Sequence, residues 1–221
     1  MGKLIVIEGL DASGKATQSE ILAERLKAEG KKVRLISFPD YESDGSVLVR
    51  RYLGGALGSD PSETNAYASS MFFAADRYYS YRTDWKKDYA DPDCIIIANR
   101  YTTANAYHQI SKLQKSEWDG FLSWLFDFEF GKLGLPSPDR VICLEVPTAV
   151  SEKLLNERCR ETGVKKDIHE ADHNYLAACR EAAMYASKKL GWSLIHCSDG
   201  ENILPRETIA DMIASELSGV I

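Results

Sequence analysis

The sequence lacks the long apolar run that a membrane-spanning helix requires. Its longest apolar stretches are LIVI at 4–7 and CIIIA at 94–98, whereas a bilayer span takes about 20 residues. No basic leader is expected either, because Met1-Gly2-Lys3 leads directly into a strand-like segment. These absences predict a cytoplasmic protein with no secretory signal and no membrane partner.

Basic residues and paired cysteines are also scarce. The chain carries 27 lysines and arginines against 33 acidic residues, a net charge of −6. Duplex nucleic acid is bound by basic side chains that neutralise many phosphates, so no nucleic-acid partner is expected. The cysteines have no metal-binding or redox spacing, which favours reduced, mostly buried thiols. They are Cys94, Cys143, Cys159, Cys179 and Cys197.

No repeat, low-complexity tract or linker divides the 221 residues. A chain of this length buries one core and at most a small appended lid. We therefore expect a single domain over residues 1–221, with a small mobile lid at about 150–172.

Five short apolar runs alternate with helix-length segments. Nearly continuous apolar runs are typical of parallel strands covered on both faces. The expected strands are KLIVIE (3–8), KVRLISF (32–38), CIIIAN (94–99), RVICLEV (140–146) and WSLIHCS (192–198). Such alternation builds βαβ units, so the pattern predicts an α/β fold with a doubly wound, five-stranded parallel sheet and helices on both faces.

The expected helices have recognisable ends. One begins at Asp60, because Asp60 and Glu63 can form a capping box around a first turn. The other expected helices cover about 14–29, 148–160, 172–190 and 205–217.

A glycine-rich segment, GLDASGKAT, follows the first expected strand and opens a helix. It approximates G-x-x-x-x-G-K-[ST], whose glycines let backbone N–H groups turn towards phosphate oxygens. The helix N-terminus adds positive potential, and Lys15 can reach the β and γ oxygens of ATP. The alternative is an ordinary glycine-containing turn. The predicted ATP-binding residues are Gly9, Leu10, Asp11, Ala12, Ser13, Gly14, Lys15, Ala16 and Thr17.

Ala16 departs from this pattern, which has serine or threonine after the lysine. A methyl group cannot bind Mg²⁺, but Thr17 stands one position later, as in the G-K-G-T of adenylate kinases, which this stretch resembles. The sequence also lacks an Asn-Lys-x-Asp element for guanine. A nucleotide kinase therefore fits better than a GTPase.

Beyond this loop, nearly the whole chain resembles the thymidylate kinases. The segments that occur in that family's order and spacing are EGLDASGKATQ (8–18), FPDY (38–41), FFAADR (72–77), NRYTTANAYHQ (99–109) and GLPSPD (134–139). The resemblance implies a P-loop NTPase-type fold and transfer of the γ-phosphoryl group of ATP to dTMP to give dTDP. It also implies ATP and Mg²⁺ as cofactors and a homodimer.

The resemblance also implies a set of acceptor-binding residues. Phe73 and Arg77 share one face of a helix, where a ring can stack on a pyrimidine and a guanidinium can donate to its carbonyl edge. Taken alone, Phe73 would belong to the core and Arg77 to the surface. Met71 and Phe72 are expected in the core. The rest of the set is Asp11, Phe38, Tyr41, Arg100, Asn105 and His108.

Alternatives remain for three of these residues. By resemblance Asp11 contacts the acceptor's 3′-hydroxyl, although an aspartate in a turn commonly bonds its own backbone. His108 falls where family members line the base and sugar, although alone it fits a solvated helix histidine. Tyr41 follows Asp40 in a loop where family members often carry arginine, and its hydroxyl can bind the acceptor phosphate.

The residues expected to stabilise charge during transfer are Lys15, Arg100, Arg158 and Arg160. Arg100 follows the third expected strand, at the edge where open α/β sheets bind ligands. An arginine there can bridge the acceptor phosphate and the transferring group. The glycine-rich segment 9–17, called the phosphate loop below, carries no basic residue at positions 10–13. The charged segment 157–173 is therefore expected to supply an arginine that stabilises the transferring phosphoryl group. The alternative is a solvated charged loop.

No protein ligand to Mg²⁺ is assigned. Ala16 has no oxygen, and Asn99 stands where the family pattern has aspartate before Arg-Tyr. A neutral amide attracts a hard cation less than a carboxylate does. Two alternatives therefore stay open: a kinase for another pyrimidine (deoxy)nucleotide, and a non-catalytic nucleotide-binding paralogue.

Overall fold

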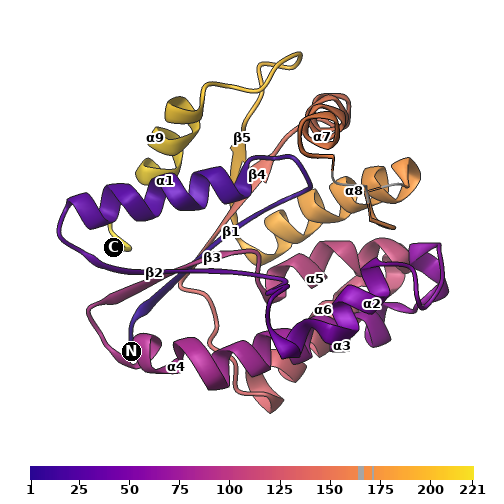
Figure 1. Ribbon diagram of the computed structural model, residues 1–221, viewed down its shortest axis with the longest axis horizontal. Helices are drawn as coiled ribbons and strands as arrows, with labels where there is room; N and C mark the ends of the chain where they lie inside the picture. Colours follow the sequence, from indigo (N-terminus) through magenta and orange to yellow (C-terminus); the bar gives the residue numbers. More distant parts are fainter. Residues whose placement is uncertain (164–166, 171) are drawn as a thin grey trace.

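The structure, a computed structural model, describes residues 1–163, 167–170 and 172–221. Within these residues one parallel sheet has the strand order β2-β3-β1-β4-β5 (Figure 1). Its strands are β1 (Lys3–Gly9), β2 (Lys32–Ser37), β3 (Cys94–Asn99), β4 (Arg140–Glu145) and β5 (Ser193–His196). The predicted doubly wound α/β fold and its five strands are confirmed.

Helices cover both faces of this sheet (Figure 1). Helices α1 and α9 pack on one face, where Val150 of α7 joins their cluster, and α3, α4, α5, α6 and α8 lie on the other side. The helices are α1 (Lys15–Ala28), α2 (Val47–Leu53), α3 (Ala66–Ser80), α4 (Lys86–Ala90), α5 (Thr102–His108), α6 (Trp118–Phe126), α7 (Thr148–Thr162), α8 (His173–Leu190) and α9 (Arg206–Leu217).

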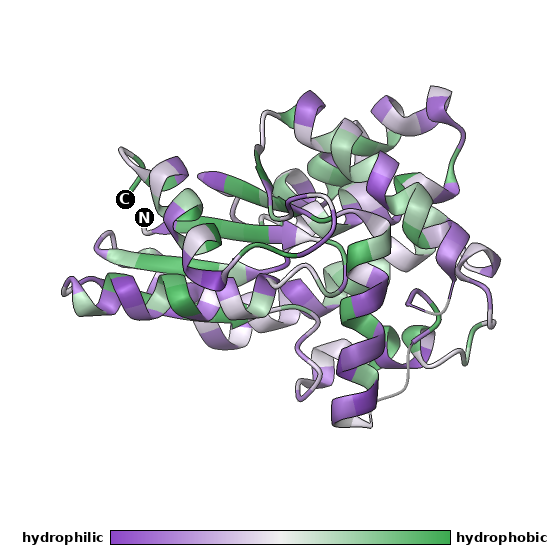
Figure 2. Cartoon of the chain, turned by 90° about the horizontal axis from the view of Figure 1, so that it is seen from above, coloured by the Kyte–Doolittle hydropathy of each residue, from purple (hydrophilic) through white to green (hydrophobic). Residues whose placement is uncertain are grey.

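The central strand β1 is buried on both faces because successive side chains point to opposite sides of a sheet. Ile5 and Ile7 are buried in the cluster formed with α1 and α9. Leu4 and Val6 are buried on the other side, in a cluster with Trp85. Figure 2 shows the strands coloured mainly as hydrophobic, while many helical residues are hydrophilic. This two-sided burial explains the continuous apolar runs in the sequence.

The long helix α3 begins later than predicted. Asp60 and Glu63 do form a capping box, but it closes only one 3₁₀ turn, Pro61–Glu63. A capping box stabilises a first turn and does not specify how far the helix continues. The residue that caps α3 is Asn65, whose side chain accepts a hydrogen bond from the backbone N–H of Ala68 at 2.9 Å.

The prediction that Met71 lies in the core is wrong, because Met71 is 50% exposed. Phe72 is half-buried and packs beside Tyr52. The inward face of α3 carries polar residues instead, among them the buried Asp76 and Arg77. The polar residues on the inward face of α3 invert the usual hydrophobic pattern of a helix. This inversion is why the prediction for Met71 was wrong.

All five cysteines are free, and all but Cys159 are buried, as predicted. No helix in the described part of the chain is long and apolar enough to cross a membrane. Residues 164–166 and 171 of the predicted lid lie outside the described residues. The single domain and the mobility of the lid at 150–172 stay predictions.

Candidate active site

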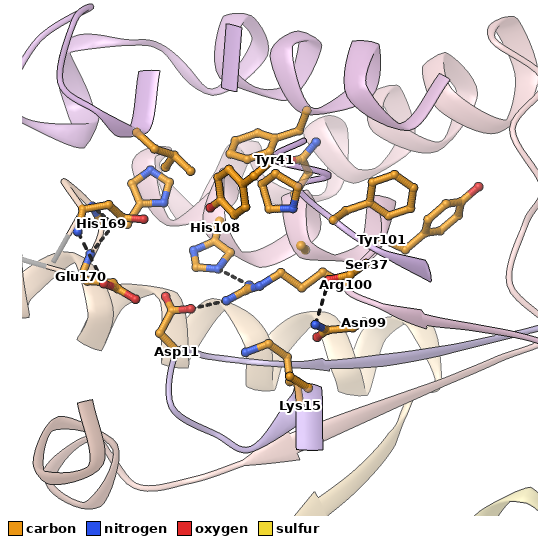
Figure 3. Close-up of a pocket in the computed structure, with 18 of the residues that line it drawn as sticks. Asp11, Lys15, Ser37, Tyr41, Asn99, Arg100, Tyr101, His108, His169 and Glu170 are labelled. Atoms are coloured by element: carbon orange, nitrogen blue, oxygen red, sulfur yellow. Dashed lines mark hydrogen bonds and ion pairs between the residues drawn. The ribbon is translucent and has the colours of Figure 1, made fainter. Parts of the chain in front are cut away.

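A cavity of about 400 Å³ opens at the carboxyl ends of β1, β2 and β3 (Figure 3). Open α/β sheets bind ligands at this edge. The predicted site residues that line the cavity are Asp11, Ala12, Gly14, Lys15, Ala16, Thr17, Phe38, Tyr41, Phe73, Arg77, Arg100, Asn105, His108 and Arg158.

Four predicted residues are not part of the cavity lining: Gly9, Leu10, Ser13 and Arg160. Gly9 instead allows the close packing of the phosphate loop, because a Cβ there would come within 2.6 Å of the Leu144 carbonyl oxygen and of Ser13 Oγ. Its φ of +146° also favours glycine. Arg160 is exposed, so its role in transfer stays a prediction.

Lys15 lies folded into the phosphate loop. Its ammonium group donates a hydrogen bond to the Leu10 carbonyl oxygen at 2.6 Å, and its side chain is buried. Burial, together with the nearby Arg100 guanidinium, lowers the pKa of Lys15 to about 7. No side chain caps α1 at Gly14, so the N-terminal N–H groups of α1 suit an anion.

Arg100 holds the centre of the cavity (Figure 3). Its φ is +66°, a strained conformation that non-glycine residues keep mainly at functional sites. The guanidinium pairs with Asp11 and lies 3.0 Å from His108 Nε2. Burial alone would raise the pKa of Asp11, but the Arg100 and Lys15 charges outweigh it and hold that pKa well below its usual range. Asp11 therefore faces Arg100 and not its own backbone.

His108 is buried, with only 7% of its surface exposed, which excludes a solvated helix histidine. Burial and the Arg100 charge lower the pKa of His108 well below its usual range, so the ring is neutral. Since a guanidinium only donates, Nε2 accepts from Arg100. Nδ1 therefore carries the proton and lies 3.5 Å from Cys179 Sγ.

Arg77 is not a surface charge, because it is only 2% exposed. Its guanidinium forms a two-point ion pair with Glu129, through Nη2 at 2.6 Å and Nε at 2.7 Å. Phe73, one turn earlier on α3, is half-buried and lines the same cavity. Sequence spacing placed these two side chains together, but the partner Glu129 was not predicted.

The segment 167–170 closes one side of the cavity and contributes three residues that sequence reasoning missed, Asp167, His169 and Glu170. His169 Nε2 lies 2.7 Å from the Tyr52 hydroxyl, which also accepts a hydrogen bond from Lys112 at 2.8 Å. Burial, and then the Lys112 charge, lower the pKa of His169 to about 3. The His169 ring is therefore neutral, and it shares a hydrogen bond with the Tyr52 hydroxyl.

Asn99 ends β3 at the cavity edge. Its Nδ2 donates to Ser37 Oγ at 3.0 Å, whereas its buried Oδ1 has no hydrogen-bond partner among the described residues. No group of three or more His, Cys, Asp or Glu residues in the described chain is arranged to hold a metal ion.

Comparison with known proteins decides the family. The sequence profile "Thymidylate kinase" matches residues 7–205. The chain is 32% identical over 196 residues to a thymidylate kinase of Mycobacterium tuberculosis, covering 86% of this chain and 87% of that protein. It is 32% identical over 164 residues to a probable thymidylate kinase of Thermococcus onnurineus, covering 73% and 75%. This chain belongs to the thymidylate kinase family.

The fold agrees with this assignment. A solved thymidylate kinase from Candida albicans is similar at a TM-score of 0.68 and 20% identity, covering 98% of this chain and 91% of its own. The resemblance drawn from the sequence motifs is thereby confirmed. The protein is a dTMP kinase, a phosphotransferase that binds nucleotides and uses ATP.

The missed residues of this thymidylate kinase carried weak signals. Asp167, His169 and Glu170 lie in the charged segment 157–173, in which only the arginines had a predicted role. Glu170 accepts a hydrogen bond from Arg158 at 2.6 Å. The same segment therefore supplies both the predicted arginine and the carboxylate that pairs with it. Tyr101 and Ser37 also line the cavity. Their signal was their position at strand ends, the edge where open α/β sheets bind ligands.

ATP binding by this kinase is expected to take up protons on the alkaline side of neutrality. Lys15 has a pKa of about 7 without a phosphate ligand, and a bound phosphate favours its charged form. Calorimetric titration with ATP at about pH 8.5, in buffers of different ionisation enthalpy, measures this uptake.

The matched control is Lys15→Arg, since arginine stays charged throughout this range. Equal uptake by the variant, or none by the parent enzyme, would contradict the expectation.

Proposed function

We propose that dTMP and ATP meet across the cavity, with Arg100 between them. The supporting observation is its position, because Arg100 contacts Asp11 of the phosphate loop on one side and His108 of α5 on the other. From there a guanidinium reaches both the acceptor phosphate and the transferring group. Lys15 and Arg158 supply further positive charge from the loop and from α7.

The acceptor binds on the α3 and α5 side of Arg100. The thymine ring stacks on Phe73, and Arg77 and Asn105 donate and accept at its polar edge. Phe38 and Tyr41 border the sugar and phosphate, and Asp11 faces the 3′-hydroxyl. Burial raises the pKa of Tyr41 to about 12, so its hydroxyl stays a hydrogen-bond donor for the phosphate.

Catalysis by these residues consists of positioning and charge stabilisation. As negative charge spreads over the transferring phosphoryl oxygens, fixed cations stabilise it without reorganising. Arg158 lies on the cavity wall, paired with Glu170, and is therefore oriented before a nucleotide arrives. We assign the lid role to Arg158 ahead of the exposed Arg160.

Mg²⁺, which neutralises phosphate charge in such reactions when bound, fits this cavity through water and ATP phosphates. Ala16 offers it no oxygen. Asn99 Oδ1 is buried and has no hydrogen-bond partner in the described part of the chain, and together with Ser37 Oγ it can accept hydrogen bonds from metal-bound water. This cation keeps several waters in most protein sites, so the departures at Ala16 and Asn99 are compatible with a working kinase.

The decisive test of this function is ATP consumption with a panel of nucleoside monophosphates. We expect dTMP to be the preferred acceptor, because Phe73, Arg77 and Asn105 form a flat, polar-edged base site. Equal or better kcat/KM with UMP, CMP or AMP would contradict the proposal and favour another pyrimidine kinase. Binding of ATP and dTMP without turnover would instead indicate a non-catalytic paralogue.

Arg158→Ala is expected to lower kcat by about 10², with little change in KM for ATP, because the arginine is needed most in the transition state. Arg160→Ala, a similar change on the exposed side of α7, is the matched comparison. Steady-state kinetics of both variants decide between them, and a larger loss for Arg160→Ala would show that the lid arginine was assigned wrongly.

Asn99→Asp is expected to lower the Mg²⁺ concentration that gives half-maximal rate, since a carboxylate attracts the hydrated cation more strongly than an amide. Mg²⁺ titrations at saturating ATP and dTMP measure the shift. Asn202→Asp adds the same charge at an exposed position and controls for net charge. An unchanged Mg²⁺ requirement in Asn99→Asp would place the metal elsewhere.

We also propose a homodimer, and a cytoplasmic location that the free thiols support. The outer side of α3 and α6 carries exposed or half-buried apolar side chains, with Tyr67 and Trp124 rings 4.7 Å apart and Met71 one turn away. Clusters of this kind commonly mark protein interfaces.

Sedimentation of the parent protein is expected to show a dimer, and Met71→Glu is expected to shift it towards monomer by placing a charge in the interface. Met212→Glu, on the opposite layer at α9, is the matched control with a similarly exposed methionine. A monomeric parent, or equal behaviour of both variants, would exclude this interface.

A further inference from the structure

Glu129 is a buried carboxylate that the reaction described above does not use. It is 0% exposed and lies in the π-helical turn Asp127–Lys132, which directly follows α6. A buried carboxylate is costly unless every oxygen is paired. The identity of its partners therefore shows what Glu129 stabilises.

The partners of Glu129 include the two polar groups of the base site. Arg77 donates from Nη2 to Oε1 at 2.6 Å and from Nε to Oε2 at 2.7 Å. Asn105 Nδ2 donates to Oε1 at 3.3 Å, and the Thr102 hydroxyl donates to Oε2 at 2.7 Å. One carboxylate thus joins α3, which carries Arg77, to α5, which carries Asn105.

This contact fixes the orientation of the Asn105 amide. Its Nδ2 lies 3.3 Å from Glu129 Oε1 and 3.4 Å from the Ser70 carbonyl oxygen, and both of these atoms can only accept. A flipped amide would turn its oxygen towards two acceptors, which is unfavourable. Asn105 lines the cavity, so Oδ1, an acceptor, is the atom it offers to a ligand.

The same contact fixes the guanidinium of Arg77. Nε and Nη2 donate to Glu129, whereas Nη1 makes, among the described residues, a single 3.4 Å contact with the Tyr101 carbonyl oxygen. Nη1 is therefore the donor that Arg77 offers to the cavity. Glu129 also cancels the charge of Arg77, which suits a neutral base and disfavours capture of a phosphate at this end of the cavity.

The base site thus presents a donor from Arg77 and an acceptor from Asn105. Thymine has the complementary edge, with a carbonyl oxygen that accepts beside a ring N3–H that donates. Cytosine has the opposite order, with an amino group that donates beside an N3 that accepts. We propose that Glu129 is the positioning residue that imposes this donor–acceptor order and so the preference for thymine over cytosine. The proposal rests on the proposed function, since it takes Arg77 and Asn105 as the base-binding groups.

The test is Glu129→Gln, which keeps the shape but turns an NH₂ group towards the Arg77 or Asn105 donors. We expect the ratio of kcat/KM for dTMP to that for dCMP to fall at least about tenfold, mainly through a higher KM for dTMP. KM for ATP should stay within about twofold. The ratio of dTMP to dUMP should not change, because thymine and uracil share the same polar edge.

Glu145→Gln is the matched control. Glu145 is also buried and pairs with Arg180 and His196, neither of which lines the cavity. A general cost of removing a buried carboxylate therefore shows in both variants. Loss of the dTMP to dCMP ratio is expected only for Glu129→Gln.

The outcomes separate this inference from the proposed function. If the parent enzyme does not prefer dTMP to dCMP, the proposed function fails. If it does, and folded Glu129→Gln keeps the parent ratio, the role of Glu129 is overturned. If circular dichroism shows that Glu129→Gln does not fold, Glu129→Asp replaces it in the test. Aspartate keeps the negative charge that pairs with Arg77, but its side chain is one methylene shorter and moves the carboxylate away from Arg77 and Asn105. The same fall in ratio is then expected, and an unchanged ratio overturns the proposal.

Discussion

The carboxylate of Glu8 joins the two halves of the active site. Glu8 stands near the end of β1, directly before the phosphate loop. Its Oε1 accepts from the Tyr101 backbone N–H at 3.0 Å and from the Thr103 hydroxyl at 2.6 Å, and its Oε2 accepts from the Tyr107 hydroxyl at 2.8 Å. These donors lie at or within α5, the helix that carries the proposed acceptor-side residues Asn105 and His108. Because a carboxylate is buried favourably only with its donors in place, the phosphate loop and α5 are fixed relative to each other.

The conformation of Arg100 follows from this junction. Its N–H is held by the Ile7 carbonyl oxygen at 3.1 Å, and the next N–H, of Tyr101, is held by Glu8. The chain passes between these two anchors with φ of +66° at Arg100, and the side chain turns into the cavity towards Asp11. The backbone strain is therefore balanced by buried hydrogen bonds on either side of it, and the guanidinium is fixed before any substrate binds.

The sequence predicts the strands and the phosphate loop well, but it does not predict the buried residues that hold the site in place, and the reason is physical. Strand burial and the phosphate loop are local patterns of period or spacing, and the Phe73–Arg77 pair follows from one helical turn. Glu8 and Glu129 are different, because a carboxylate is recognised as buried only once its donors from other segments are known. The prediction for Met71 was wrong for a related reason, since the inner face of α3 is polar where it lines the cavity. A single sequence does not reveal which distant segments supply the hydrogen-bond donors for a buried carboxylate.

The cations of the cavity are held by carboxylates in the absence of nucleotide: Arg100 by Asp11 and Arg158 by Glu170. A phosphate need not displace these partners, because a guanidinium has five donors in a planar fork and each carboxylate uses only part of it. Asp11 and Glu170 therefore orient the two arginines, and the Arg100 guanidinium, of which Asp11 takes only Nη2, suits phosphate oxygens as well. In the proposed mechanism, these like charges are therefore brought together on folding, and nucleotide binding adds an anion to a site already arranged for it.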